Sequence, residues 1–216
     1  MRNLIPLLLI LLIGCEQAIE PDNANIPDSA ADVTPLLVGM QIPEIELKDT
    51  KNKTVSLNSE ISKKPTAIIY YRGGWCPYCN KQLAGLREIE DELYDLGIKM
   101  LAISPDSPEF LSETLAEHEI SYHLLSDQKM EGAKKMGIAF RVDQETADRY
   151  KENGLDLNER SGQDHLLLPV PSVFLVDTEG KIHFQYVNPD YKVRISGNLL
   201  LAAAKELMES QVAASM

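Results

Sequence analysis

The chain has little positive charge. Its 216 residues include 21 Lys and Arg against 33 Asp and Glu, which gives a formal net charge of -12. No basic stripe stands out, whereas a protein that binds nucleic acid needs clustered Lys and Arg to neutralise phosphates. The composition therefore argues against nucleic acid as a partner, and the acidity is more simply interpreted as favouring solubility.

The chain also lacks an apolar run that could span a bilayer. The most apolar run, from Leu4 to Ile13, has ten residues, whereas a spanning helix needs about 20. It follows the positive charge of Arg2 and ends at the small residue Gly14. A charged start, a short apolar core and a small residue are typical of an export signal.

The end of this run, Leu12-Ile13-Gly14-Cys15, resembles the lipobox of bacterial lipoproteins. The resemblance implies that residues 1–14 are a signal peptide and that Cys15 carries lipid. It also implies a location in the bacterial cell envelope, anchored through lipid and facing the periplasm. Glu16 is not the aspartate associated with inner-membrane retention, so the outer membrane is favoured. Ordinary secretory cleavage nearby and an uncleaved anchor are the alternatives.

Few apolar residues follow, and those present show no periodicity. Residues 15–37 contain mainly Pro, Asn, Ala, Asp and Ser, and such a composition buries too little surface to become ordered. We expect a flexible tether over this stretch. Residues 38–216 are then enough for one domain with a real core.

Cysteine is scarce, and two of the three cysteines lie two residues apart, at Cys76 and Cys79. The apolar run 67–71 before them predicts a strand buried on both faces. After them, apolar residues recur at steps of three and four as far as Leu96, which predicts one face of a helix. This strand, turn and helix arrangement around a CxxC is typical of a redox motif.

The position of the pair at a helix start favours reactivity, because free N–H groups and the helix dipole lower a thiol pKa there. Zinc is an alternative, but the pair supplies two of the usual four ligands. His118 and His123 are far away in the sequence for a compact finger. A purely structural disulfide is weaker still, since so short a loop removes little chain entropy.

The remaining pattern predicts an α/β domain with a βαβ half followed by a ββα half. We expect a hairpin over 45–57, strands at 98–103, 122–125, 172–176 and 181–187, and helices over 107–119, 130–136 and 194–208. The crossover rule makes the strand at 98–103 parallel to the one at 67–71. Residues 138–168 form a polar insertion that we interpret as surface decoration.

The motifs YRGGWCPYCNKQL and LPVPSVFLVD resemble the thioredoxin superfamily. More closely, they resemble the peroxiredoxin-like branch of the alkyl hydroperoxide reductase/thiol-specific antioxidant family, over residues 38–207. The resemblance implies a thioredoxin-like fold with a central mixed sheet flanked by helices. It also implies that Pro171 matches the cis-proline that lies beside the CxxC in thioredoxins.

Two departures from these families bear on activity. Peroxiredoxins carry a Thr or Ser three residues before the reactive cysteine, where this chain has Cys76 or Gly73, depending on the register. Thioredoxins carry a buried Asp six residues before their first cysteine, where this chain has Tyr70. The first departure shifts the expectation from peroxidase activity toward disulfide exchange.

The leading hypothesis is therefore a thiol–disulfide oxidoreductase with an antioxidant role. Cys76 attacks a protein or small-molecule disulfide, and Cys79 resolves the mixed disulfide. Arg72 either favours the thiolate or is an ordinary surface charge, and Trp75 packs beside the pair or belongs to the core. The chemistry needs an unidentified electron donor but no metal or cofactor.

Two other functions stay open. One is a thiol peroxidase that reduces hydroperoxides, with one cysteine passing through sulfenic acid and the other resolving it. The other is a non-catalytic lipoprotein that binds a partner or zinc. The sequence leaves open which cysteine attacks.

Overall fold

The structure, a computed structural model, describes residues 26–118 and 122–214. The predicted signal peptide, the predicted lipidation site Cys15 and residues 16–25 of the predicted tether lie outside the described residues. Within the described part, no helix is both long enough and apolar enough to cross a membrane.

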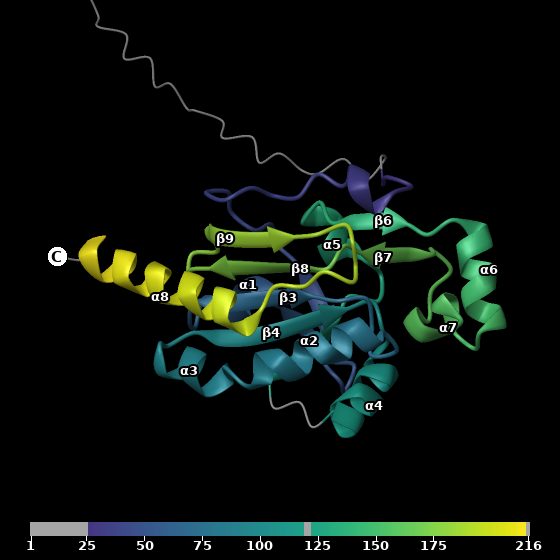
Figure 1. Ribbon diagram of the computed structural model, residues 1–216, viewed down its shortest axis with the longest axis horizontal. Helices are drawn as coiled ribbons and strands as arrows, with labels where there is room; N and C mark the ends of the chain where they lie inside the picture. Colours follow the sequence, from purple (N-terminus) through teal and green to yellow (C-terminus); the bar gives the residue numbers. More distant parts are fainter. Residues whose placement is uncertain (1–25, 119–121, 215–216) are drawn as a thin grey trace, which may run out of the picture.

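A mixed seven-stranded sheet forms the centre of the domain (Figure 1). Its strand order is β2-β1-β5-β4-β3-β8-β9. The strands are β1 (Glu46–Lys48), β2 (Thr54–Ser56), β3 (Thr66–Tyr70), β4 (Lys99–Ser104), β5 (His123–Ser126), β8 (Ser172–Val176) and β9 (Ile182–Val187).

Strand β3 lies inside the sheet, and all five of its residues are buried. It pairs in parallel with β4 and antiparallel with β8. The predicted parallel crossover is therefore confirmed, as is the antiparallel hairpin of β8 and β9. The βαβ half and the ββα half meet at the β3–β8 pair. The CxxC therefore follows a strand in the middle of the sheet.

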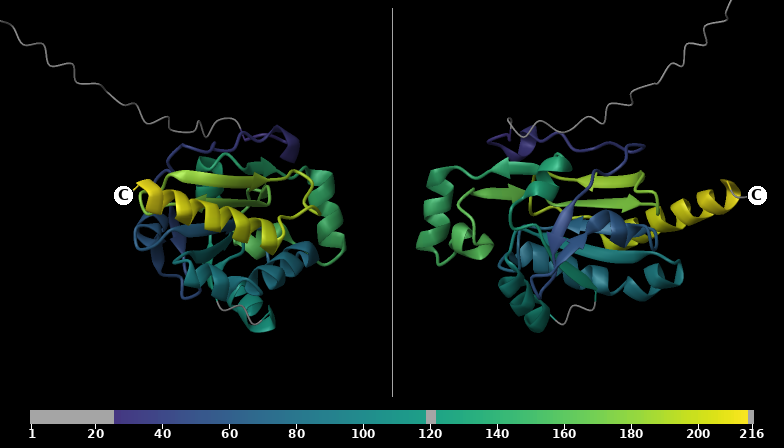
Figure 2. Two further views of the ribbon diagram at one scale, coloured as in Figure 1. Left: turned by 60° about the vertical axis from the view of Figure 1, so that its left-hand side comes forward. Right: turned by 180° about the vertical axis from the view of Figure 1, so that it is seen from behind.

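Helices cover both faces of the sheet (Figures 1 and 2). One face packs against α2 (Pro77–Arg87), α3 (Glu90–Asp95), α4 (Pro108–His118) and α8 (Gly197–Ala214). The other packs against α1 (Leu57–Ile61) and α5 (Glu131–Lys135). Alternate residues of β3 belong to the two hydrophobic cores: Ile69 lies in the first and Ile68 in the second.

The helix after the CxxC differs from the expected one. The periodicity predicts one helix to Leu96, whereas the structure has α2 and α3 with a break at Ile89, whose φ of -109° and ψ of 5° are not helical. The predicted apolar face is still buried on both sides of the break. A Cβ on Gly197 at the start of α8 would lie 3.2 Å from both Ile89 and the Gly85 carbonyl. The chain therefore bends where α8 crosses it closely.

Residues 138–168 fold into a unit of their own at one end of the sheet (Figure 1). It contains β6 (Ala139–Arg141), α6 (Gln144–Glu152) and α7 (Leu157–Ser161), and β6 pairs antiparallel with β7 (Leu167–Pro169). Val142, Ala147, Leu157 and Leu168 form its small core, and Trp75 packs against that core. The unit therefore touches the loop that carries the CxxC.

The expected flexible tether needs correcting over residues 26–37. Ile26 and Leu36 pack against the second core, and η1 (Ala30–Asp32) is a short helix capped by the Ser29 side chain. The Leu36 N–H donates to the Met136 carbonyl at 3.1 Å. Apolar side chains spaced too irregularly to show a period are enough to hold this stretch on the domain.

Candidate active site

Cys76 is the N-cap of α2, and Pro77 follows it in the first turn. Proline is favoured there because its fixed φ suits a helix and its missing N–H would have no partner inside the helix. Cys79 lies one turn into α2 and faces the core. The sequence pattern therefore placed both cysteines correctly at the junction of β3 and α2.

The loop between β3 and α2 needs its two glycines. Gly73 has a φ of +143°, and a Cβ there would overlap the Trp75 ring. A Cβ on Gly74 would overlap the Thr114 side chain of α4. Glycine is needed at both positions because the loop passes so close to the Trp75 and Thr114 side chains that a Cβ would not fit.

The two cysteines are free and buried, with exposed fractions of 1% for Cys76 and 0% for Cys79. Hydrogen bonding from the Cys79 side chain lowers the pKa of Cys76 to about 6, helped by the Cys79 backbone and the positive charges of Arg72 and Arg194. Burial and the hydrogen bond to Cys76 raise the pKa of Cys79 well above its ordinary value. Cys76 is therefore the thiolate near neutral pH, and Cys79 is the thiol that donates to it.

Arg72 is 5% exposed, which contradicts the surface-charge alternative. Its guanidinium carbon lies 4.2 Å from the ring centre of Tyr191 and 5.0 Å from that of Trp75. Its Nη2 donates to the Tyr150 hydroxyl at 2.8 Å. Among the described residues, no carboxylate forms an ion pair with Arg72, and its Nε has no hydrogen-bond partner. The positive charge is left to act on the Cys76 thiolate.

Arg194 is a site residue that the sequence analysis missed. It was expected in the last helix, but α8 begins only at Gly197, and Arg194 lies in the loop that joins β9 to α8. Its Nη2 donates to Cys79 Sγ at 3.3 Å and its Nη1 to Gln82 Oε1 at 3.0 Å. Because 115 residues separate it from Cys79, no local pattern could reveal the contact.

The unit at residues 138–168 also contributes to the site, so the surface-decoration interpretation is wrong. The Tyr150 ring of α6 lies 6.2 Å from that of Trp75, and its hydroxyl accepts from Arg72. Arg160 of α7 binds Asp106, and Asp106 in turn binds the Gly74 backbone. Trp75 is half-buried between this unit and the main core, which agrees with its predicted packing role.

Pro171 lies near Arg72, but the expected cis peptide bond is absent and the bond before Pro171 is trans. The Val170 N–H donates to the Ile138 carbonyl at 2.8 Å, which continues the β6–β7 pairing one residue beyond β7. Pro171 lines a hollow of about 210 Å³ together with Arg72, Phe140, Tyr150 and Tyr191. This hollow adjoins the Arg72 side chain, but neither cysteine lines it.

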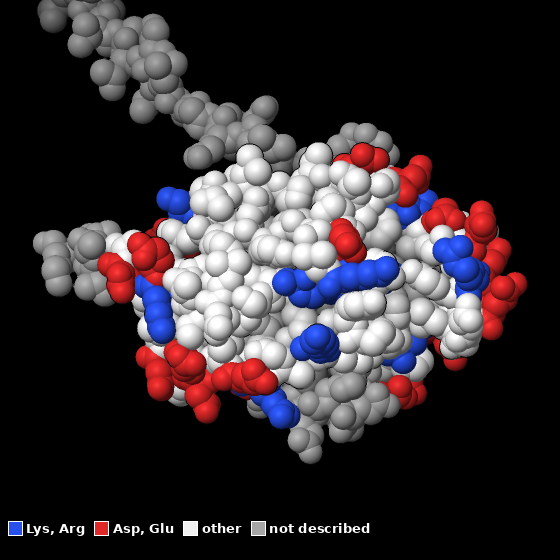
Figure 3. Space-filling model, in the orientation of Figure 1, with Lys and Arg blue, Asp and Glu red and all other residues white. Residues whose placement is uncertain are grey.

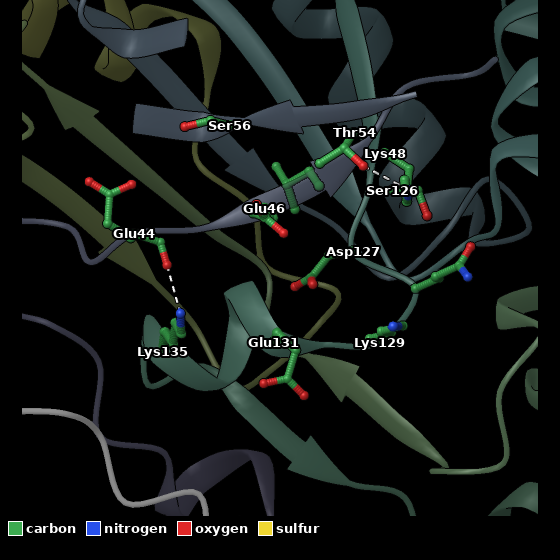
Figure 4. Close-up of a pocket in the computed structure, with 12 residues that line it drawn as sticks. Glu44, Glu46, Lys48, Thr54, Ser56, Ser126, Asp127, Lys129, Glu131 and Lys135 are labelled. Carbon is green, nitrogen blue, oxygen red and sulfur yellow. Dashed lines mark hydrogen bonds between the residues drawn. The ribbon is translucent and has the colours of Figure 1, made fainter. Parts of the chain in front are cut away.

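The charges near the site differ from those of the whole chain. Figure 3 shows mostly Lys and Arg among uncharged groups near the centre of the face that carries α2 and the β9–α8 loop, whereas acidic groups gather mainly along the margins. A larger hollow of about 590 Å³ lies elsewhere, between β1, β5 and α5 (Figure 4), and contains no cysteine. The described residues include no cluster of three or more His, Cys, Asp or Glu that could hold a metal.

Similarity to known proteins agrees with this geometry. A model of the AhpC/TSA family matches residues 38–185. A putative peroxiredoxin bcp of Haemophilus influenzae is 37% identical over 106 residues, which cover 49% of this chain and 68% of that protein. Peroxiredoxin Bcp of Escherichia coli is 26% identical over 174 residues, covering 81% of this chain and 99% of that protein.

Solved structures share the fold at low identity. Peroxidoxin BcpB of Mycobacterium tuberculosis has a TM-score of 0.61 at 19% identity, covering 78% of this chain and 96% of that chain. Peroxiredoxin Q of Xanthomonas campestris has a TM-score of 0.60 at 18% identity, covering 82% and 99%. The thioredoxin-like fold predicted from the sequence is therefore confirmed. Since the family model covers more than half of the chain and includes the CxxC loop, the chain belongs to the AhpC/TSA family.

Proposed function

We propose that this protein is a thiol peroxidase that reduces hydroperoxides with the Cys76 and Cys79 pair. Family membership makes it a peroxiredoxin-like oxidoreductase, and its relatives are named peroxiredoxins. The observation that carries the proposal is Cys76, a buried cysteine whose pKa is lowered to about 6. With 1% of the residue exposed, a hydroperoxide reaches the sulfur more easily than a protein disulfide does.

The reaction needs no group beyond the two cysteines and a reductant. The Cys76 thiolate attacks the terminal oxygen of the hydroperoxide, the O–O bond breaks, and the alkoxide or hydroxide that leaves takes a proton. The resulting sulfenic acid is attacked by Cys79. The S–O bond breaks, water leaves with the Cys79 proton, and a disulfide forms. An external dithiol then reduces the disulfide with two electrons.

The surrounding side chains support these steps. The Arg72 charge stabilises the Cys76 thiolate, and the same side chain lines the 210 Å³ hollow. Arg194 lies against Cys79 and favours the thiolate that Cys79 must become in the second step. Trp75 and Pro171 shape the surroundings of Arg72.

Hydroperoxide consumption by single-cysteine variants tests the assignment. We expect Cys76→Ser to abolish consumption, because the attacking thiolate is gone. Cys79→Ser should still consume about one equivalent and leave a sulfenic acid that dimedone traps at Cys76. Trapping at Cys79 in Cys76→Ser would reverse the roles, and consumption by neither the wild type nor a variant would refute the peroxidase.

Disulfide exchange is the second candidate, and one observation favours it. The CPYC motif brings two interacting thiols together at a helix start, and neither alignment of the peroxiredoxin motif supplies its Thr or Ser hydroxyl. Reduction of insulin disulfides by the reduced protein measures this activity. Wild-type turnover of insulin that disappears in Cys76→Ser would support disulfide exchange. If the wild type does not reduce insulin, the thiol peroxidase is the remaining candidate of the two.

We also propose that the protein is exported and anchored through lipid on Cys15, facing the periplasm. The support is the ten-residue apolar run and the lipobox-like residues 12–15. Incorporation of labelled palmitate into the wild type and its loss in Cys15→Ser would be the expected result. Equal labelling of the two, or none, would contradict the anchor.

A further inference from the structure

Asp106 is a buried carboxylate that holds the loop carrying Cys76. Its exposed fraction is 1%, and it lies between β4 and α4, far from the CxxC in sequence. Its Oδ2 accepts a hydrogen bond of 2.7 Å from the Gly74 backbone N–H, two residues before Cys76. A backbone group of the reactive loop therefore depends on a side chain outside the loop.

The Gly74 residue is held from two directions. Its N–H donates to Asp106, while its carbonyl accepts from Asn80 Nδ2 of α2 at 2.7 Å. The Cys76 N–H donates to the Gly73 carbonyl at 3.2 Å. Two consecutive glycines are otherwise free to take many conformations. These contacts select the one in which Cys76 caps α2.

Arg160 of α7 holds Asp106 in turn. Its Nε donates to Asp106 Oδ1 at 3.2 Å and its Nη2 to Oδ2 at 3.0 Å, the forked geometry that makes Arg–carboxylate pairs strong. The guanidinium carbon lies 3.8 Å from the centre of the Phe110 ring. The Arg160 carbonyl also accepts from the Ser107 N–H at 2.8 Å. Arg160 is thus fixed through its side chain and its backbone.

The contact between α7 and the reactive loop is closely packed. The cavity where Trp75, Asp106, Leu157 and Arg160 meet has room for only about one water molecule. A close-packed contact transmits displacement rather than absorbing it. A displacement of α7 therefore displaces the Gly74 backbone.

We propose that Asp106 and Arg160 are positioning residues for Cys76, and that the unit at 138–168 contributes to the reaction centre through Arg160. They act through the Gly74 N–H, which fixes Cys76 where the Cys79 side chain and backbone can reach its sulfur. The inference rests on the proposed function only in taking Cys76 as the attacking thiolate.

Without Arg160, Asp106 is a buried carboxylate that pairs with no other cation among the described residues. Burial already raises the pKa of Asp106, so the loss favours the protonated form, which accepts the Gly74 hydrogen bond less strongly. The loop then loosens, and Cys76 loses part of the hydrogen bonding that lowers its pKa.

The test measures the pKa of Cys76 from the pH dependence of its alkylation by iodoacetamide, with the modified peptide identified by mass. This reaction needs no hydroperoxide. In Arg160→Met we expect an upward shift in the Cys76 pKa of about half a unit or more. The kcat/KM for hydrogen peroxide should fall on the order of 10- to 100-fold, as expected when a reacting group is slightly misplaced. Arg160→Lys, which keeps the charge but not the fork, should recover part of both.

Glu113→Gln is the matched control, because Glu113 is the exposed second partner of Arg160, at 3.8 Å. It should leave the Cys76 pKa unchanged. A wild-type Cys76 pKa in folded Arg160→Met would overturn the proposal, and Arg160→Gln serves the same purpose if the methionine variant does not fold. If the wild type consumes no hydroperoxide but the Cys76 pKa still shifts in Arg160→Met, the proposed function fails and the positioning role stands.

Discussion

At the scale of single residues, the positive charges of two guanidinium groups act on the sulfurs of the cysteine pair. Arg72 lies against the rings of Trp75 and Tyr191, and Arg194 donates directly to Cys79. Neither cation forms an ion pair with a carboxylate among the described residues, so their charges are available to the sulfurs. The Arg72 charge favours the Cys76 thiolate, whereas the Arg194 charge favours the thiolate of both cysteines.

Arg72→Met should raise the pKa of Cys76. The buried guanidinium favours the thiolate through its charge, so its loss should shift the Cys76 pKa upward by up to about one unit. Alkylation of Cys76 by iodoacetamide as a function of pH measures it. Arg149→Met, at an exposed arginine of α6, is the matched control. An identical Cys76 pKa in Arg72→Met and the control would contradict the electrostatic role.

Arg194→Met should slow the second step more than the first. Arg194 offsets part of the burial that raises the pKa of Cys79, so the resolving thiolate becomes scarcer without it. We expect disulfide formation to slow roughly tenfold, the effect of about one pKa unit, while the Cys76 sulfenic acid accumulates. Dimedone trapping after one equivalent of hydrogen peroxide shows the accumulation. Equal trapping in wild type and variant would place Arg194 outside the resolving step.

At the scale of elements, sequence periodicity predicts the secondary structure that residues close together in the chain determine. The run at 67–71 predicted β3, because a strand buried on both faces is apolar throughout. The break at Ile89 lies where the start of α8 approaches closely, a contact that no local pattern encodes. Arg194 and Tyr150 reach the site from loops and helices far along the chain. Local pattern thus predicts the pair of cysteines and the nearby Arg72, but not the groups that reach the pair from far along the chain.

The close contact between α5 and the N-terminal stretch gives a test of packing. Gly137 ends α5 with a φ of +69°, and a Cβ there would overlap the Thr34 carbonyl. Gly137→Ala should therefore lower the free energy of unfolding through both backbone strain and overlap. We expect about 3 kcal/mol, which combines the left-handed cost with overpacking. Urea denaturation measures it.

Gly154→Ala is the matched control for that substitution. Gly154 has a similar φ of +84°, but nothing lies near its Cβ position. It should cost only the left-handed strain, about 1 kcal/mol. Equal losses in the two variants would show that residues 34–36 do not hold α5 as the contact implies.

At the scale of the whole molecule, stability should depend on a carboxyl remote from the reaction centre. Asp127 lies at the N-terminal end of α5, at the wall of the 590 Å³ hollow (Figure 4). It accepts from the Gly132 N–H at 3.0 Å and from the Ala133 N–H at 2.7 Å. Its side chain makes no ion pair among the described residues. Burial, the largest cause, raises the pKa of Asp127 to about 7.

The sign of the effect follows from this raised pKa. The unfolded chain releases the Asp127 proton near pH 3.9, whereas the folded protein holds it until about pH 7. The contribution of Asp127 to stability is therefore complete below about pH 4 and is lost as the pH rises toward 7, by up to about 1.4 kcal/mol per pH unit. Urea denaturation at pH 4.5 to 7 should show this decline in the wild type and a smaller one in Asp127→Asn. Asp95→Asn, at an exposed site on α3, should keep the wild-type slope, and the same slope in Asp127→Asn would show that Asp127 is ionised throughout.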